Sequence, residues 1–217
     1  MKMIRMGWLK KLLLIIWLTA LIAACGAEKS HSVIPTNATV VILGDSLTYG
    51  TGADNGQDYA SLLANNTGWN VINAGVPGNT SSNGLERLPD LLSEQRVDLL
   101  IVELGGNDFL RHLPEAETAK NLKAILAQSK AKNIPTLLLA IPAFSPIGAA
   151  FGNLSDHPLY EKLAKETHTA LIDDVFSDVL SKNSLKADSI HPNAEGYRMV
   201  EEGLRTALIK QGFLSEK

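Results

Sequence analysis

The sequence predicts a three-layer α/β/α fold, in which helices cover both faces of a parallel sheet of about five strands. Short apolar or β-branched runs recur along the chain and are continuous rather than alternating, as expected for strands buried on both faces. Amphipathic stretches separate these runs, and this βαβα order is typical of a parallel sheet covered on both sides. The predicted strands are 40–43, 70–72, 99–104, 136–141 and 170–172.

Residues 1–24 form a candidate bacterial signal peptide and stand outside the predicted fold. Four basic residues lie within the first eleven positions, and the apolar stretch 12–24 is shorter than a bilayer span requires. Two alanines then precede Cys25, the only cysteine, and this resembles the lipobox of lipoproteins, in which the cysteine is lipidated. The alternatives are an ordinary signal peptide with an incidental thiol, or a retained membrane anchor. A lipobox predicts an exported protein that is lipid-anchored in the bacterial cell envelope.

Residues 25–37 are polar and lack periodicity, which predicts a flexible tether, and residues 38–217 are predicted to form a single domain. Without the leader the formal net charge moves from −3 to about −7, and an acidic chain argues against nucleic acid as a partner. A single cysteine excludes an internal disulfide. We expect a monomer that is held at the membrane by its N-terminal lipid.

The predicted helices lie between the strands and after them. They cover 58–64, 85–94, 115–130 and 158–166, and a final helix runs from Pro192 to about residue 210. Pro114 suits the first turn of the third helix, because its fixed φ favours that position. In a parallel sheet of this kind, ligands bind outside the carboxyl ends of the strands. Ser46, Gly75 and Asn107 each follow one of the first three strands, so we expect them to converge on one edge.

Two short motifs supply the groups of a serine hydrolase. Ser46 follows the first strand in Gly44-Asp45-Ser46-Leu47, and Asp188 precedes His191 by three residues. A serine nucleophile needs a base such as histidine, and the base needs a group that orients it. Each motif alone is weak, because a Gly-Asp-Ser turn often only joins a strand to a helix, and polar residues before a proline often cap one. The G-x-S-x-G pattern of α/β-hydrolases is absent, since Thr48 stands where that pattern needs glycine.

Four separated blocks together resemble the SGNH (GDSL) hydrolase family. They are Gly44-Asp45-Ser46-Leu47, Asn73-Ala74-Gly75, Gly105-Gly106-Asn107-Asp108 and Asp188-Ser189-Ile190-His191, and the resemblance spans about residues 38–212. The stretches 41–47, 102–108 and Gly84-Leu85-Glu86-Arg87-Leu88-Pro89 also resemble the branch that contains the periplasmic multifunctional thioesterase/lysophospholipase/arylesterase. The resemblance implies a serine hydrolase with a flavodoxin-like SGNH fold.

The resemblance also implies a role for each matching residue. Ser46 would be the nucleophile, His191 the general base and then the general acid, and Asp188 the carboxylate that orients the imidazole. The oxyanion hole would consist of the backbone N–H groups of Ser46 and Gly75 and the side-chain amide of Asn107.

Three further carboxylates near these blocks are predicted to be structural. Asp45 and Asp108 should brace their turns, and Glu103, inside a predicted strand, should be a paired carboxylate near the strand end rather than a catalytic one. No cluster of histidine, cysteine and carboxylate residues has the spacing of metal ligands, and no glycine-rich loop fits a nucleotide. The sequence therefore predicts neither a metal nor a cofactor.

Apolar residues beside the predicted site are candidates for the substrate groove. Phe109, Leu110 and Leu113 follow the third strand, and the loop after the fourth contains Phe144 and Ile147. The alternative is that these side chains anchor loops in the core. We predict a serine esterase that hydrolyses acyl or aryl esters, with thioesters or lysophospholipids as further substrates. A carbohydrate or peptidoglycan O-acetylesterase, and a non-catalytic acyl-binding lipoprotein of the envelope, are the competing interpretations.

Overall fold

The structure is a computed structural model, and it describes residues 32–143, 148 and 152–216. The candidate signal peptide and Cys25 lie outside the described residues, as do Phe144 and Ile147. Lipid anchoring and the monomeric state therefore stay predictions. In the described part of the chain, no helix is both long and apolar enough to cross a bilayer.

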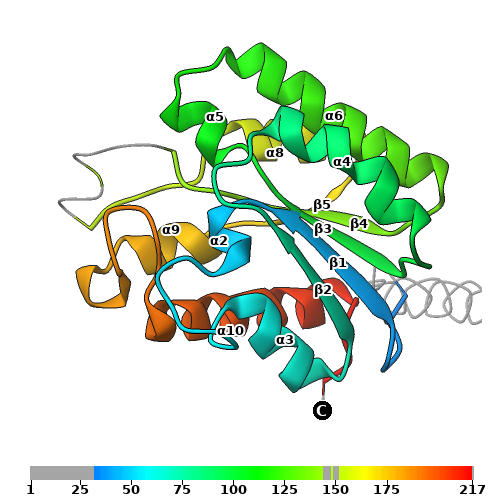
Figure 1. Ribbon diagram of the computed structural model, residues 1–217, viewed down its shortest axis with the longest axis horizontal. Helices are drawn as coiled ribbons and strands as arrows, with labels where there is room; N and C mark the ends of the chain where they lie inside the picture. Colours follow the sequence, from blue (N-terminus) through cyan, green and yellow to red (C-terminus); the bar gives the residue numbers. More distant parts are fainter. Residues whose placement is uncertain (1–31, 144–147, 149–151, 217) are drawn as a thin grey trace, which may run out of the picture.

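A five-stranded sheet forms the middle layer of the domain (Figure 1). Its strands are β1 (Thr39–Gly44), β2 (Asn70–Gly75), β3 (Leu99–Glu103), β4 (Thr136–Leu139) and β5 (Ala170–Ile172). They lie in the order β2-β1-β3-β4-β5, and every neighbouring pair is parallel. At the carboxyl end of β1, Gly44 is paired with Gly75 on one side and with Glu103 on the other. The ends of these three strands are therefore level with one another.

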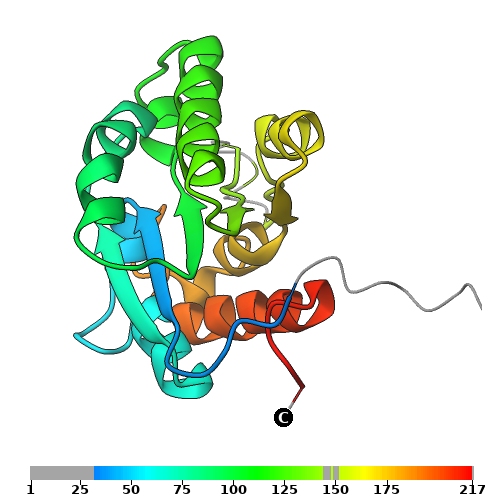
Figure 2. The ribbon, with the colours of Figure 1, turned by 90° about the vertical axis from the view of Figure 1, so that its right-hand side faces the viewer.

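Helices cover both faces of this sheet (Figures 1 and 2). One face carries α4 (Ser81–Ser93), α6 (Glu115–Ala131) and α8 (Leu159–Thr167). The other face carries α3 (Tyr59–Thr67), α9 (Val175–Leu180) and α10 (Ala194–Gln211). Residues 40–43 and 99–102 of the central strands have no exposed surface, because both of their faces are covered. The predicted α/β/α fold with a parallel sheet is confirmed.

The elements that the sequence does not predict individually are short. They are α2 (Ser46–Tyr49), α5 (Gly106–Leu110), α9 and the 3₁₀ helix η1 (Asn183–Leu185). Segments of three to six residues are too short for a helical period to be recognised. The ends of β1 and β3 differ from the prediction by one residue. Two strand ends differ by more, because pairing with β1 extends β2 to Gly75 and the last residue of β4 paired with β5 is Leu139.

The predicted tether, 25–37, extends too far toward the domain. Ile34 is buried in the core, and its N–H donates to the Phe213 carbonyl oxygen at 2.8 Å. The Asn37 N–H donates to the Gly68 carbonyl oxygen at 3.0 Å. The folded domain begins earlier than predicted because burial of the apolar Ile34 side chain is favourable. Both ends of the described chain therefore meet at the amino ends of the strands (Figure 2).

Gly196 of α10 is predicted not to tolerate a side chain. A Cβ at this position would lie 2.2 Å from the Leu185 carbonyl oxygen, a backbone atom that cannot rotate away. Gly196→Ala should therefore lower the free energy of unfolding by roughly 1–3 kcal/mol, measured by urea denaturation.

Gly203→Ala in the same helix is the matched control. Its Cβ would lie 3.3 Å from Val175 Cγ2, a side-chain atom, and alanine is favoured over glycine in a helix by roughly 1 kcal/mol. The free energy of unfolding should change by less than about 1 kcal/mol. A loss at position 203 as large as that at position 196 would contradict the steric explanation.

Candidate active site

Ser46 lies in the turn that follows β1 and is the first residue of α2. Asp45 caps this helix, because its Oδ1 accepts a hydrogen bond from the Leu47 N–H at 3.0 Å. From the neighbouring strand β3, Glu103 Oε2 accepts from the Thr48 hydroxyl at 2.6 Å, from the Thr48 N–H at 3.2 Å and from the Asp45 N–H at 3.3 Å. The turn is therefore tied to the sheet on both sides of Ser46.

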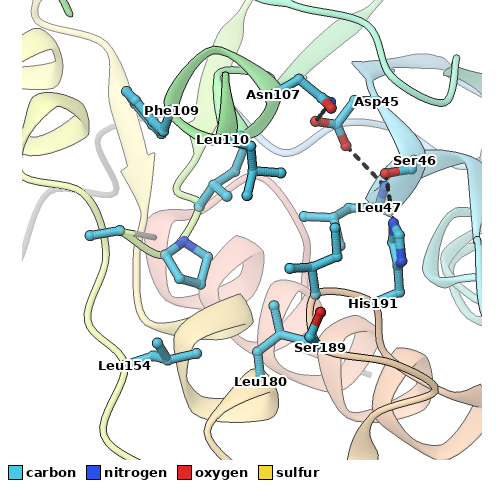
Figure 3. Close-up of a pocket in the computed structure, with 15 residues that line it drawn as sticks. Asp45, Ser46, Leu47, Asn107, Phe109, Leu110, Leu154, Leu180, Ser189 and His191 are labelled. Atoms are coloured by element: carbon cyan, nitrogen blue, oxygen red, sulfur yellow. Dashed lines mark hydrogen bonds between the residues drawn. The ribbon is translucent and has the colours of Figure 1, made fainter. Parts of the chain in front are cut away.

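His191 and Asp188 approach Ser46 from the loop that precedes α10. His191 Nε2 lies 2.9 Å from Ser46 Oγ (Figure 3), and His191 Nδ1 lies 2.7 Å from Asp188 Oδ2. This loop is anchored by an isolated β-bridge between Lys186 and Pro192 and by Asn193, whose side chain caps α10. A hydroxyl, an imidazole and a carboxylate thus form one continuous series of hydrogen bonds.

Asp188 accepts three hydrogen bonds that favour its charged form. Oδ1 accepts from the N–H groups of Ile190 and His191 at 2.9 and 2.8 Å, and Oδ2 faces the His191 ring. Partial burial acts to raise the pKa of Asp188, but these hydrogen bonds outweigh it and hold the pKa below its ordinary value. An ionised carboxylate in this place favours the tautomer of His191 that carries its hydrogen on Nδ1.

Gly75 ends β2 directly against α2. A Cβ at this position would lie 2.2 Å from the Tyr49 backbone nitrogen, so glycine is needed for the strand and the helix to come this close. The Gly75 N–H donates to Asn73 Oδ1 at 3.0 Å. The Ser46 N–H, in contrast, has no acceptor among the described residues. Of the two backbone donors that the sequence predicts here, the structure thus leaves one uncommitted.

Asn107, on α5, has both hydrogens of its side-chain amide engaged. Nδ2 donates to Asp45 Oδ2 at 2.9 Å and to the Asn79 carbonyl oxygen at 3.0 Å. Figure 3 shows the first of these contacts beside Ser46. The sequence predicts the amide in this place but not its two acceptors.

An apolar pocket of about 380 Å³ opens beside Ser46 and His191. Its volume is within the range of small-molecule sites. In Figure 3 the polar groups of Asp45, Ser46, Asn107 and His191 are gathered at one end of the pocket, and Leu154 lies at the other. The apolar residues of the wall are Leu47, Phe109, Leu110, Ile141, Pro142, Ala143, Leu154, Leu180 and Ile190.

Only some of the residues predicted to form the substrate groove line the pocket. Phe109 and Leu110 line the pocket. Leu113 does not, because it follows the end of α5 and is 41% exposed. Leu154 and Leu180 line the pocket without having been predicted. They belong to segments without a motif, so no local signal marks them.

Two carboxylates, Asp45 and Glu103, are buried next to Ser46 without a lysine or arginine paired to them in the described part of the chain. Burial raises the pKa of Asp45 to about 6, although hydrogen bonds from Leu47 and Asn107 lower it. Burial, and then the charge of Asp45, raise the pKa of Glu103 well above its ordinary value. Glu103 Oε1 is buried and has no hydrogen-bond partner among the described residues. Burial therefore disfavours the ionised form of Glu103, and the hydrogen bonds from Thr48 and Asp45 offset this effect only in part.

Asp108 holds two helices against the Asn107 turn. Its carboxylate accepts from the Ser81 N–H at 2.8 Å and from the Ser81 hydroxyl at 2.5 Å, at the start of α4. It also accepts from the Thr118 hydroxyl of α6 at 3.2 Å. These contacts brace the turn, which is the structural role predicted for Asp108.

A comparison with models of protein families assigns the chain to one family. The model of the GDSL-like lipase/acylhydrolase family matches residues 42–199, from within β1 into α10, and the match includes all four blocks. The chain belongs to this family. Membership confirms the resemblance to the SGNH (GDSL) hydrolases and identifies the chain as a hydrolase.

Relatives of this GDSL-family hydrolase agree with the assignment. Thioesterase 1/protease 1/lysophospholipase L1 of Escherichia coli strain K12 is 35% identical over 175 residues, covering 78% of this chain and 83% of the relative. Esterase TesA of Pseudomonas aeruginosa is 32% identical over 160 residues, covering 71% and 79%. The structure of the psychrotrophic esterase EstA from Pseudoalteromonas sp. superposes with a TM-score of 0.68 at 28% identity, covering 79% of this chain and 97% of that one.

The raised pKa of Asp45 makes the stability of the hydrolase depend on pH. Because the folded state binds this proton more tightly than the unfolded chain, the resulting stability is present below about pH 4 and is lost as the pH rises to about 6. Asp45→Asn cannot lose a proton. Its free energy of unfolding should therefore rise relative to wild type between pH 4 and 6, by roughly 1–3 kcal/mol, measured by urea denaturation at several pH values. A difference that does not vary with pH would contradict the pKa shift.

Proposed function

We propose that this GDSL-family hydrolase is a serine esterase that cleaves acyl or aryl esters through an acyl-enzyme intermediate. The observation that carries the proposal is the distance of 2.9 Å between Ser46 Oγ and His191 Nε2 at one end of an apolar pocket. A serine hydroxyl becomes a nucleophile when an adjacent base takes its proton.

The proposed reaction has two halves. Ser46 Oγ attacks the ester carbonyl carbon while His191 Nε2 takes the hydroxyl proton, and Asp188 stabilises the imidazolium that forms. The carbon–oxygen bond to the leaving alcohol breaks as His191 returns the proton to that oxygen, which leaves an acyl ester on Ser46. Water, deprotonated by His191, then attacks this ester and releases the acid, and Ser46 recovers its proton.

Hydrogen-bond donors near Ser46 would stabilise the oxyanion of each tetrahedral intermediate. The Ser46 N–H is uncommitted among the described residues, and it is the first such donor. Asn107 would be the second, with its amide kept in its present orientation by its two acceptors and one amide hydrogen shared between its acceptor and the oxyanion. Gly75 would be the third, with its N–H leaving the Asn73 side chain. The Ser46 N–H and the Asn107 amide are already held in place beside the nucleophile, and donors that need little reorganisation during the reaction favour catalysis.

The apolar wall of the pocket supports an acyl or aryl group as the part of the substrate that it binds. The names of the relatives, a thioesterase/lysophospholipase and an esterase, suggest thioesters and lysophospholipids as further substrates. An acetyl group would fill only a small part of this volume, which disfavours an O-acetylesterase. The hydrogen bonds that join Ser46, His191 and Asp188 disfavour a binding protein without activity.

Ser46→Ala should abolish ester hydrolysis, because it removes the attacking oxygen. The rate with p-nitrophenyl esters should fall by at least roughly 10³-fold without a change in melting temperature, and a fluorophosphonate probe should no longer label the protein. Ser189→Ala is the control, since Ser189 is a second serine of the same pocket, and this variant should still be labelled. Labelling of Ser46→Ala, or a rate near that of wild type, would refute the nucleophile.

Leu154→Trp should shorten the acyl chain that the enzyme accepts, because Leu154 lies at the end of the pocket remote from Ser46 (Figure 3). The ratio of kcat/KM for p-nitrophenyl decanoate to that for the butyrate should fall roughly tenfold. Leu113→Trp, outside the pocket, should leave the ratio within about twofold of wild type. Equal ratios in the two variants would show that the acyl chain does not reach Leu154.

A further inference from the structure

A half-buried arginine connects the end of β1 with the loop after β2, close to Ser46. Arg87 of α4 donates from Nη2 to the Gly44 carbonyl oxygen and from Nε to Asn79 Oδ1, both at 2.9 Å. Gly44 ends β1 two residues before Ser46, and Asn79 lies in the loop after β2. Arg87 has no carboxylate partner in the described part of the chain, and burial lowers its pKa. A cation that is partly removed from water for neutral acceptors alone needs a reason for its position.

The contacts of Arg87 continue through Asn79 to the proposed oxyanion donor. The Asn79 carbonyl oxygen accepts one amide hydrogen of Asn107 at 3.0 Å, and Asp45 Oδ2 accepts the other at 2.9 Å. Asp45 follows Gly44 directly in the chain. The hydrogen bonds and this one peptide link therefore close a ring through Arg87, Asn79, Asn107, Asp45 and Gly44.

This ring determines the rotation of the Asn107 amide. The two hydrogens of a side-chain amide lie in one plane, so their two acceptors set the orientation of that plane. One acceptor, Asp45, is held because it caps α2. The other, the Asn79 carbonyl, belongs to a loop, in which the Asn79 N–H donates to the Val76 carbonyl oxygen at 3.0 Å. Asn79 directly precedes Thr80, the N-cap of α4, and Arg87 adds a second tie by binding the Asn79 side chain from the next turns of that helix.

We propose that Arg87 is a positioning residue for ester hydrolysis, which acts through Asn79 on the amide of Asn107. The inference rests on the proposed function, in which Asn107 donates to the oxyanion. Without Arg87, the Asn79 side chain loses its donor, the loop carbonyl shifts, and the amide turns away from the direction that the transition state needs. A misplacement of about 1 Å far from the reacting atoms can lower the rate by roughly 10².

Arg87→Met tests this role, because it keeps most of the apolar stem and removes the guanidinium. The kcat with p-nitrophenyl butyrate should fall roughly 10- to 100-fold while KM stays within about twofold. Asn79→Ala removes the acceptor from the other side and should give the same split between kcat and KM. Asn79 is a partly exposed loop residue, so Asn79→Ala still tests the positioning role if Arg87→Met does not fold. An unchanged kcat in the folded variants would overturn the proposal.

Arg111→Met is the matched control for the loss of an arginine at this loop. Arg111 Nη2 donates to the carbonyl oxygen of Gly78, the neighbour of Asn79, at 2.8 Å, but Arg111 lies outside the ring. Its kcat should change by less than about twofold. A loss as large as that of Arg87→Met would mean that general loosening of the loop, rather than the ring, lowers the rate.

A double-mutant cycle with Asn107→Ala separates the inference from the function on which it rests. Asn107→Ala alone should lower kcat by roughly 10²–10³. In that background Arg87→Met should lower kcat by less than about twofold more, because the amide that Arg87 positions is gone. Equal losses in both backgrounds would overturn the positioning role and leave the oxyanion donor intact. An unchanged kcat in Asn107→Ala would overturn both the oxyanion donor and the positioning role. If the proposed serine esterase mechanism were wrong, Ser46→Ala would instead remain active.

Discussion

The hydrogen bonds between Glu103 and the turn after β1 hold the candidate site in place. Parallel pairing sets Glu103 level with Gly44, so its side chain reaches the start of α2. One carboxylate oxygen then accepts from the Asp45 N–H, the Thr48 N–H and the Thr48 hydroxyl. A buried donor without its acceptor costs roughly 1–3 kcal/mol, so these contacts strongly favour one conformation of the turn. The direction of Ser46 toward His191 follows from that conformation.

This arrangement places acidic groups where an ordinary core would have apolar ones. Asp45 and Glu103 are both buried, burial raises the pKa of both, and the charge of Asp45 further raises the pKa of Glu103. Asp45 nevertheless holds two groups of the site, the cap of α2 and the amide of Asn107. If packing were the only requirement at these two positions, apolar side chains would be more favourable than two buried carboxyl groups. Departures of this kind from local rules are typical of functional sites.

The sequence was informative where a local pattern has one structural meaning. Continuous apolar runs predicted the buried strands, and the rule that ligands bind at the carboxyl ends of parallel strands brought Ser46 and Asn107 to one edge. What was missed depends on contacts between distant segments. Leu154 and Leu180 enter the pocket only because of how their segments pack, and the Asn79 carbonyl is an acceptor for Asn107 because of the path of one loop. Ile34, which only Val33 accompanies in an otherwise polar neighbourhood, was too small a signal to move the boundary of the tether.

The hydrogen bond between Ile34 and Phe213 brings the two ends of the domain together at the amino ends of the strands. The pocket opens at their carboxyl ends, at the opposite end of the strands. A carrier protein, an affinity tag or a solid support joined to either end of the domain would therefore sit away from the pocket. Immobilised in this way, the hydrolase would face the bulk solution, and dissolved substrates would reach Ser46 without passing the support.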